Sequence, residues 1–202
     1  MKTLSVTVTT LSSLYIGGMP KGFEIGGIDM QTATQNEKPY IPASSFKGAL
    51  RDICRDNPRT CVSELYKDYE QSKQIEEETP KHLFLFGIQG VNRSPKIIFT
   101  DLALTEATEN CFSIESKNSI TEGEGCLESN PRTYRVARSG LIFEGQMYLN
   151  FDELKRSPED TKSPQEIVEE YLVEMCNKFA EGVYRIGNSK SRGYGHVDVA
   201  IN

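Results

Sequence analysis

The sequence predicts an α+β fold in which two amphipathic helices pack on one face of an antiparallel sheet. Three observations support this. Residues 2–10 alternate between apolar and polar side chains, as a half-buried strand does. Residues 44–55 and 163–182 repeat apolar side chains at helical spacing. Alternating segments follow each of these helices, so strands and helices interleave along the chain.

The first helix is predicted to begin at Ser44 or Ser45, because either serine can serve as its N-cap. A second face carries Lys47, Arg51 and Arg55, which are spaced four residues apart. A polar, basic opening with free N–H groups favours an anion. The apolar face of this helix comprises Phe46, Ala49, Leu50, Ile53 and Cys54.

The last helix carries the clearest local signals. Ser163 is its predicted N-cap, Pro164 suits the first turn, and Glu166 completes a capping box. Gly182 is expected to end it. The buried stripe of this helix is expected to contain Ile167, Tyr171, Leu172, Met175 and Phe179.

The remaining elements are less regular. A more exposed helix is predicted over 61–78, ended by Thr79 and Pro80; the apolar run at 82–87 suits a buried strand or a turn. Strands are predicted over 94–104, over 141–151 and in the C-terminal stretch 193–201. A glycine-rich loop follows the first strand, and the pattern dissolves into polar sequence from about 106 to 140.

This order predicts a ferredoxin-like sandwich, the arrangement also found in RNA-recognition motifs. We expect a single domain over 1–202 with insertions at about 12–43, 57–82 and 106–140. A net charge of −6 argues against binding nucleic acid by bulk attraction, yet the acidic residues are concentrated in a few stretches and leave local basic strips.

Composition narrows the remaining possibilities. The N-terminus alternates instead of forming an apolar block, and no apolar run is long enough to cross a bilayer, so a cytoplasmic protein without a membrane partner is expected. The five cysteines are scattered without a C-x-x-C pair, which favours reduced structural thiols over a zinc site. His196 reads as a strand residue without a visible partner.

Three stretches carry a resemblance to a known family. They are "IPASSFKGALR" after a glycine-rich loop with "GGID", the segment "GLIFEGQMYLNF" after a long insertion, and "IGNSKSRGYGHV" before the last strand. In this order the chain resembles the RAMP superfamily of CRISPR-associated proteins. It is most similar to the repeated backbone subunit of type III (Csm/Cmr) effector complexes.

The resemblance implies a modified RNA-recognition fold that polymerises along a guide RNA. A hairpin "thumb", here at about Cys111 to Arg138, would separate guide from target, and a loop aspartate, here Asp29, would cleave the target RNA. Magnesium or manganese, weakly bound, is the expected cofactor, because one carboxylate forms no all-protein cage. The implied partners are guide RNA, target RNA, other copies of the chain and other effector subunits.

The residues add a chemical reason for RNA contact. Serines and a lysine at a helix start can bind a phosphate, glycines let a backbone approach closely, and arginines beside Tyr134 suit stacking and phosphate contact. The resulting RNA-binding candidates are Ser44, Ser45, Lys47, Arg51, Arg132, Arg135, Arg138, Lys190, Arg192, Gly193 and Gly195.

Each assignment has a plainer alternative. Asp29 could only form a turn, the two serines could only cap a helix, and the basic side chains could form a solvated face or a disordered loop. At the level of function, the alternative is a non-catalytic, single-copy subunit that caps or bridges the effector filament. An unrelated hydrolase has little support, because no Ser–His–Asp or Cys–His signature is present.

Overall fold

The computed structural model describes residues 1–18, 27–70, 81–87, 96–105, 110–122, 127–151, 154 and 162–202. The predicted end of the second helix and part of the glycine-rich loop lie outside these residues. The elements are β1 (Lys2–Thr10), β2 (Gly17–Gly18), β3 (Met30–Thr32), β4 (Thr34–Gln35), β5 (Lys38–Ile41), α1 (Ala43–Asp56), α2 (Thr60–Glu70), η1 (Lys81–Phe86), β6 (Lys96–Phe99), β7 (Leu102–Leu104), β8 (Phe112–Glu122), β9 (Leu127–Ala137), β10 (Ile142–Asn150), α3 (Pro164–Asn177), η2 (Lys190–Arg192) and β11 (Val197–Ile201).

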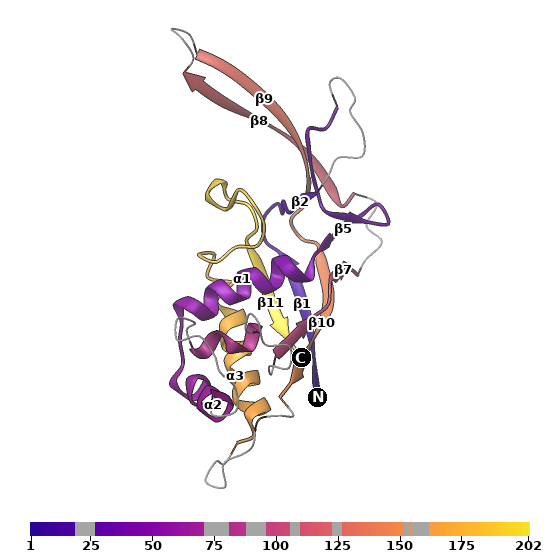
Figure 1. Cartoon of the computed structure of the whole chain (residues 1–202). Coiled ribbons are helices and arrows are strands. Elements are labelled where there is room, and N and C mark those ends of the chain that lie inside the picture. The colour runs from indigo at the N-terminus through magenta and orange to yellow at the C-terminus, as the bar shows by residue number, and fades with distance from the viewer. Residues whose placement is uncertain are drawn as a thin grey trace.

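The main sheet confirms the predicted fold class. Its strand order is β11–β1–β10–β7–β5–β4, and β6 also pairs with β10. Counting β6 and β7 as one strand interrupted by a bulge, the four principal strands stand in the order 4-1-3-2, with α1 and α3 in the two crossovers. This is the βαββαβ arrangement of ferredoxin-like folds. Figure 1 shows the helices together on one side of this sheet.

The hydrophobic core lies between the sheet and the helices. Leu4, Val6 and Val8 of β1 point inward, and their neighbours along the strand are more exposed, as the alternating sequence predicts. Phe46 of α1 stacks on Phe179 with ring centroids 6.1 Å apart. The polar pattern of β1 therefore decides which face of the sheet the helices cover.

The capping box of α3 is confirmed, whereas its predicted end is wrong. The hydroxyl of Ser163 accepts from the Glu166 N–H, and the Glu166 carboxylate accepts from the Ser163 N–H at 2.6 Å. The helix ends at Asn177, five residues before Gly182, and Phe179 is buried in the turns that follow.

The segment 94–104 does not form one strand. Phe99 of β6 pairs with Met147, and Leu104 of β7 pairs with Phe143, so five residue steps on this side face four on β10. The extra residue is accommodated at Thr100, whose hydroxyl accepts from the Gln146 N–H at 2.8 Å. This is a β-bulge, which bends the strand and redirects the next side chain, Asp101.

Asp101 provides the cap of α1 that the sequence assigned to a serine. The N-cap residue is Pro42 and no side chain of the helix caps it, so the expectation for Ser44 and Ser45 is wrong. Instead the Asp101 carboxylate accepts from the Ala43 N–H at 2.7 Å. The start of α1 is thus already partly neutralised by a carboxylate from the bulge.

Replacing Asp101 by alanine is expected to lower the free energy of unfolding by about 1 kcal/mol, because the first turn of α1 loses its acceptor. Ser44→Ala and Ser45→Ala are the matched controls and should change stability by less than about 0.5 kcal/mol, since neither hydroxyl caps the helix. Urea denaturation monitored by circular dichroism measures both. A larger loss for Ser45→Ala than for Asp101→Ala would contradict the capping role of Asp101.

The insertions contain strands that the sequence pattern did not reveal. Within 12–43, β2 to β5 are each two to four residues long. Within 106–140, β8 and β9 pair over their whole length from Phe112↔Ala137 to Glu122↔Leu127. Figure 1 shows this hairpin projecting from the body of the molecule, which is the shape the thumb prediction requires. The apolar run at 82–87 begins with the buried 3₁₀ helix η1, so it is a turn and not a strand.

Candidate nucleic-acid interface

The start of α1 and the segment before β11 form one groove. This groove has a volume of about 390 Å³ and is open to solvent. Ser44, Ser45 and Arg51 line it from α1, and Asn188 and Lys190 line it from the other side. Its full lining is Ile16, Ser44, Ser45, Gly48, Ala49, Arg51, Asp52, Arg55, Gly187, Asn188 and Lys190.

We call residues 187–193 the groove loop. It is shaped by three residues with positive φ: Gly187 at 84°, Ser189 at 58° and Gly193 at 92°. The Asn188 N–H donates to the Tyr15 carbonyl at 2.7 Å, which fixes the loop against the chain that follows β1. Lys190 thereby faces the start of α1 across the groove.

The groove carries more positive than negative charge. Arg51 and Lys190 have no ion-pair partner among the described residues, whereas Arg55 is held 2.7 Å from the Asp52 carboxylate and 3.8 Å from that of Asp56. The charge of Arg55 is therefore largely satisfied within the helix. Arg51 and Lys190 remain as the two cations that can meet a phosphate.

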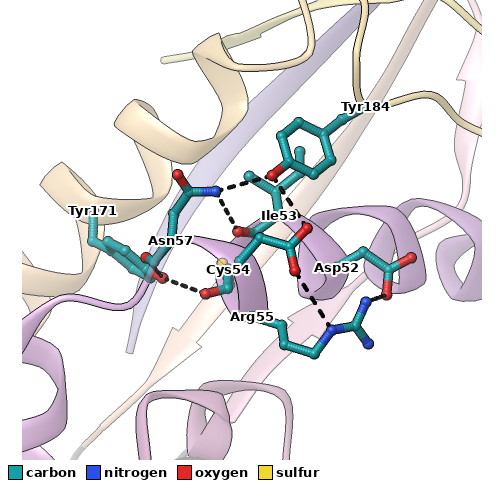
Figure 2. A network of polar contacts seen from close by, with 8 residues as sticks. Asp52, Ile53, Cys54, Arg55, Asn57, Tyr171 and Tyr184 are labelled. Carbon is teal, nitrogen blue, oxygen red and sulfur yellow. Dashed lines mark hydrogen bonds and ion pairs between the residues drawn. The ribbon is translucent and has the colours of Figure 1, made fainter.

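The far end of α1 is locked by uncharged hydrogen bonds, which Figure 2 shows together with the ion pairs of Arg55. The Asn57 amide donates to the Ile53 carbonyl at 2.8 Å and to the Tyr184 hydroxyl at 3.2 Å. The Tyr171 hydroxyl of α3 donates to the Asn57 carbonyl at 2.9 Å. The network ties α1 to α3 and to the chain that leads into the groove loop, so the two walls of the groove are held in register.

The predicted glycines serve the protein's own backbone. A Cβ on Gly195 (φ +74°) would overlap the Ile186 carbonyl oxygen, and one on Gly187 would overlap the Tyr15 carbonyl oxygen. A Cβ on Gly193 would meet nothing within 4 Å. The close approach expected of these glycines is thus confirmed for Gly187 and Gly195, but to chain segments of the protein.

Asp29 lies at the foot of the hairpin. Its N–H donates to the Thr133 carbonyl at 3.0 Å, and its Oδ2 accepts from the Thr133 N–H at 2.6 Å. These bonds extend the parallel pairing of β3 with β9, in which Met30 stands beside Tyr134. Asp29 is exposed, and its other carboxylate oxygen has no hydrogen-bond partner among the described residues.

Asp29 and the groove are joined by one short strand. Thr32, at the other end of β3, accepts through its hydroxyl from the N–H of Ile16, a groove residue, at 3.1 Å. Three residues of extended chain span about 10 Å, which is the order of the distance from Asp29 to this hydroxyl. This distance is comparable to the reach of one or two nucleotides.

The three hairpin arginines do not form one cluster. Arg132 and Arg135 lie on opposite faces of β9, since their positions differ by an odd number. Arg135 stacks on the Phe112 ring at 3.8 Å, and Arg138 donates to the Phe112 carbonyl at 2.7 Å. Tyr134 packs edge-on against Tyr15, with centroids 5.4 Å apart, so it belongs to the base of the hairpin and not to a free stacking surface.

The remaining candidate residues lie elsewhere on these elements. Lys47 is on α1 but does not line the groove, and Arg192 ends the turn η2, next to Lys190. Sequence reasoning missed Asn188 in the groove and Lys117 beneath the hairpin. Asn188 sits inside the "IGNSKSRGYGHV" motif, but its position next to a left-handed residue could only be seen in the fold.

Other chemistries find no support in the described part of the chain. No three His, Cys, Asp or Glu side chains among the described residues could hold a metal ion. Burial raises the pKa of Cys54 to about 12 and also raises that of Cys176, so neither is a reactive thiol. Within the described ranges, no helix is long and apolar enough to span a bilayer.

Comparison with known proteins places this architecture. Among solved structures, the chain is similar to a chain of the type III-B Cmr-beta complex bound to cognate target RNA, determined by cryo-electron microscopy. The TM-score is 0.64 at 17% identity, and the match covers 99% of this chain and 59% of that one. This chain thus spans 59% of its neighbour's length, and the likeness is one of fold. No curated protein sequence gives a significant match.

The sequence itself supplies the family. The family model described as the RAMP superfamily matches residues 7–198, which include the start of α1, the hairpin and the groove loop. The resemblance first noted in three short motifs therefore extends over nearly the whole chain, and the chain belongs to the RAMP superfamily.

Proposed function

We propose that this chain is a guide-RNA-binding backbone subunit of a type III CRISPR effector complex, and that it cleaves the bound target RNA through Asp29. One observation carries the proposal: two segments distant in the sequence, the start of α1 and the groove loop, form a single cationic groove. RAMP membership and the fold of a chain in a target-RNA-bound Cmr complex support it.

The groove would hold guide phosphates. Arg51 and Lys190 face the same opening from two walls, and the hydroxyls of Ser44 and Ser45 lie beside them. Charged side chains supply affinity without sequence preference, which suits a subunit that must accept any guide. The net charge of −6 is then no obstacle, because the attraction is confined to one groove.

Cleavage would use the target's own 2′-hydroxyl. Its oxygen attacks the adjacent phosphorus, the bond to the 5′-oxygen breaks, and the products carry a 2′,3′-cyclic phosphate and a 5′-hydroxyl. Asp29 would accept the 2′-hydroxyl proton, while Thr133 fixes the orientation of its carboxylate. A magnesium or manganese ion would neutralise phosphate charge, held by the second oxygen of Asp29 and by the RNA.

Substituting the groove cations tests the guide-binding part. Arg51→Ala and Lys190→Ala are each expected to weaken binding of single-stranded RNA about tenfold, and each should reduce the slope of log affinity against log salt by about 0.7. Lys162→Ala is the matched control, because it removes the same charge at the start of α3, where Lys162 pairs with Glu170 at 2.6 Å. Filter binding across a salt series measures all three. Equal affinity and slope in wild type and both groove variants would refute the groove as the guide site.

A further inference from the structure

Lys117 occupies an unusual position beneath the hairpin. Its Nζ lies 3.5 Å from the centroid of the Tyr194 ring and 4.5 Å from that of Tyr134. The Nζ atom is buried and has no hydrogen-bond partner. Burial lowers the pKa of Lys117, against the opposing effect of Glu115. A cation between two aromatic faces is attracted to both, and the attraction strengthens when water is excluded.

Glu115 completes the arrangement from the same face of β8. Its carboxylate accepts from the Tyr194 hydroxyl and, at 3.0 Å, from the hydroxyl of Ser13. Burial and the bond to Glu115 raise the pKa of Tyr194, so this tyrosine stays a neutral donor. We call Glu115, Lys117, Tyr134 and Tyr194 the thumb clamp. It joins both strands of the hairpin to the chain after the groove loop.

The thumb clamp lies between the two parts of the proposed site. On one side, Tyr134 directly follows Thr133, whose backbone holds Asp29. On the other side, Tyr194 directly follows Gly193, the last residue of the groove loop. The Gly193 carbonyl is fixed in turn by the Arg185 guanidinium at 2.8 Å. Lys117 is therefore the contact through which the hairpin and the groove loop are held at one separation.

We propose that Lys117 is a positioning residue that fixes the foot of the hairpin, and with it Asp29, relative to the groove loop. Its consequence for cleavage rests on the function proposed above; its structural part does not. A phosphate-binding role for Lys117 does not fit, because its ammonium is enclosed between two rings and a phosphate ligand must be reachable. Cleavage by an in-line attack is sensitive to displacements of about 1 Å, so a loose hairpin would slow it.

The structural part is tested by distances between spin labels on the assembled complex. Labels at Ile114→Cys on β8 and Val183→Cys before the groove loop use side chains that are 69% and 77% exposed. Cys61 and Cys126 are replaced by serine as background. We expect a narrow distance distribution for the wild-type clamp, a distribution at least twice as broad for Lys117→Met, and a narrow one again for Lys117→Arg. A Lys117→Met distribution as narrow as wild type overturns the proposal.

Lys117→Met keeps the length and apolar stem of the side chain and removes only the cation. If this variant does not fold, Tyr194→Leu takes its place, because it removes one ring of the clamp and leaves the ammonium. The same broadening is expected, and an unchanged distribution again overturns the proposal.

The functional part is tested by single-turnover cleavage with Asp29→Ala in parallel. Lys117→Met should lower the cleavage rate about tenfold with guide affinity within twofold of wild type, and Lys117→Arg should restore the rate. An unchanged rate for Lys117→Met, where Asp29→Ala is inactive, overturns the positioning role alone. Full activity of Asp29→Ala overturns the proposed cleavage function and leaves the distance measurement as the judge of the clamp.

Discussion

Replacing Asp29 by alanine is expected to abolish target-RNA cleavage while the assembled complex still retains its guide. The carboxylate is the only acidic group that the proposed reaction uses, and its loss should slow single-turnover cleavage by at least about 100-fold. Guide retention should stay within twofold of wild type, because Asp29 lies at the hairpin foot and does not line the groove. Cleavage of a labelled target by the reconstituted complex, resolved on a denaturing gel, measures the rate.

Two controls make this result specific. Asp29→Asn preserves the acceptor for the Thr133 N–H and removes the basic carboxylate, so it should be as inactive as alanine without any change in the hairpin. Asp198→Ala removes an equally exposed carboxylate from β11 and should leave the rate unchanged. Unchanged cutting by Asp29→Ala would favour the non-catalytic, single-copy subunit. Native mass spectrometry of the complex would then show one copy of the chain instead of several.

Local sequence signals predicted the elements that local interactions stabilise. The capping box of α3 lies within four consecutive residues, and its hydrogen bonds form wherever the helix forms. The alternation in β1 and β10 is long enough to define a buried face, which explains why both strands and their sheet could be predicted. Pairing of β1 with β10 follows from burying those two faces together.

Elements that depend on distant partners could not be predicted in this way. The short strands β2 to β5 have no measurable periodicity and exist because of their partners in the sheets. The cap on α1 comes from Asp101, 58 residues away, so the serines at the helix start were the natural but wrong candidates. The bulge that delivers Asp101 depends on the register of β6 and β7 against β10, which a sequence does not display.

The candidate site shows the same division. Ser44, Ser45, Arg51 and Lys190 were predicted from residue type and meet in one groove. Lys117 was missed because its role depends on pairing: opposite Arg132 in the hairpin, it shares a face with Tyr134. The stacking role expected for Tyr134 fails for the same reason, since Lys117 and Tyr15 already occupy its ring.

Gly195→Ala is expected to produce the largest loss of stability of any groove-side substitution. A Cβ at this position would overlap the Ile186 carbonyl oxygen, and the φ of +74° is itself unfavourable for alanine. Strain and overpacking together should cost about 3 kcal/mol or more, which corresponds to a fall in Tm of about 9 °C for a chain of this size. Differential scanning calorimetry measures the shift.

Gly193→Ala separates the two contributions, because Gly193 has a φ of +92° but open space where a Cβ would stand. It should cost only about 1 kcal/mol, the expense of the left-handed conformation alone. The backbone of Gly195 is fixed on both sides, since its N–H donates to the Ser13 carbonyl and its carbonyl accepts from the Ile186 N–H, each at 2.9 Å. The strand therefore cannot shift to relieve the overlap. Equal losses for the two variants would mean that the Ile186 backbone yields, and that the groove loop is held less firmly than its hydrogen bonds imply.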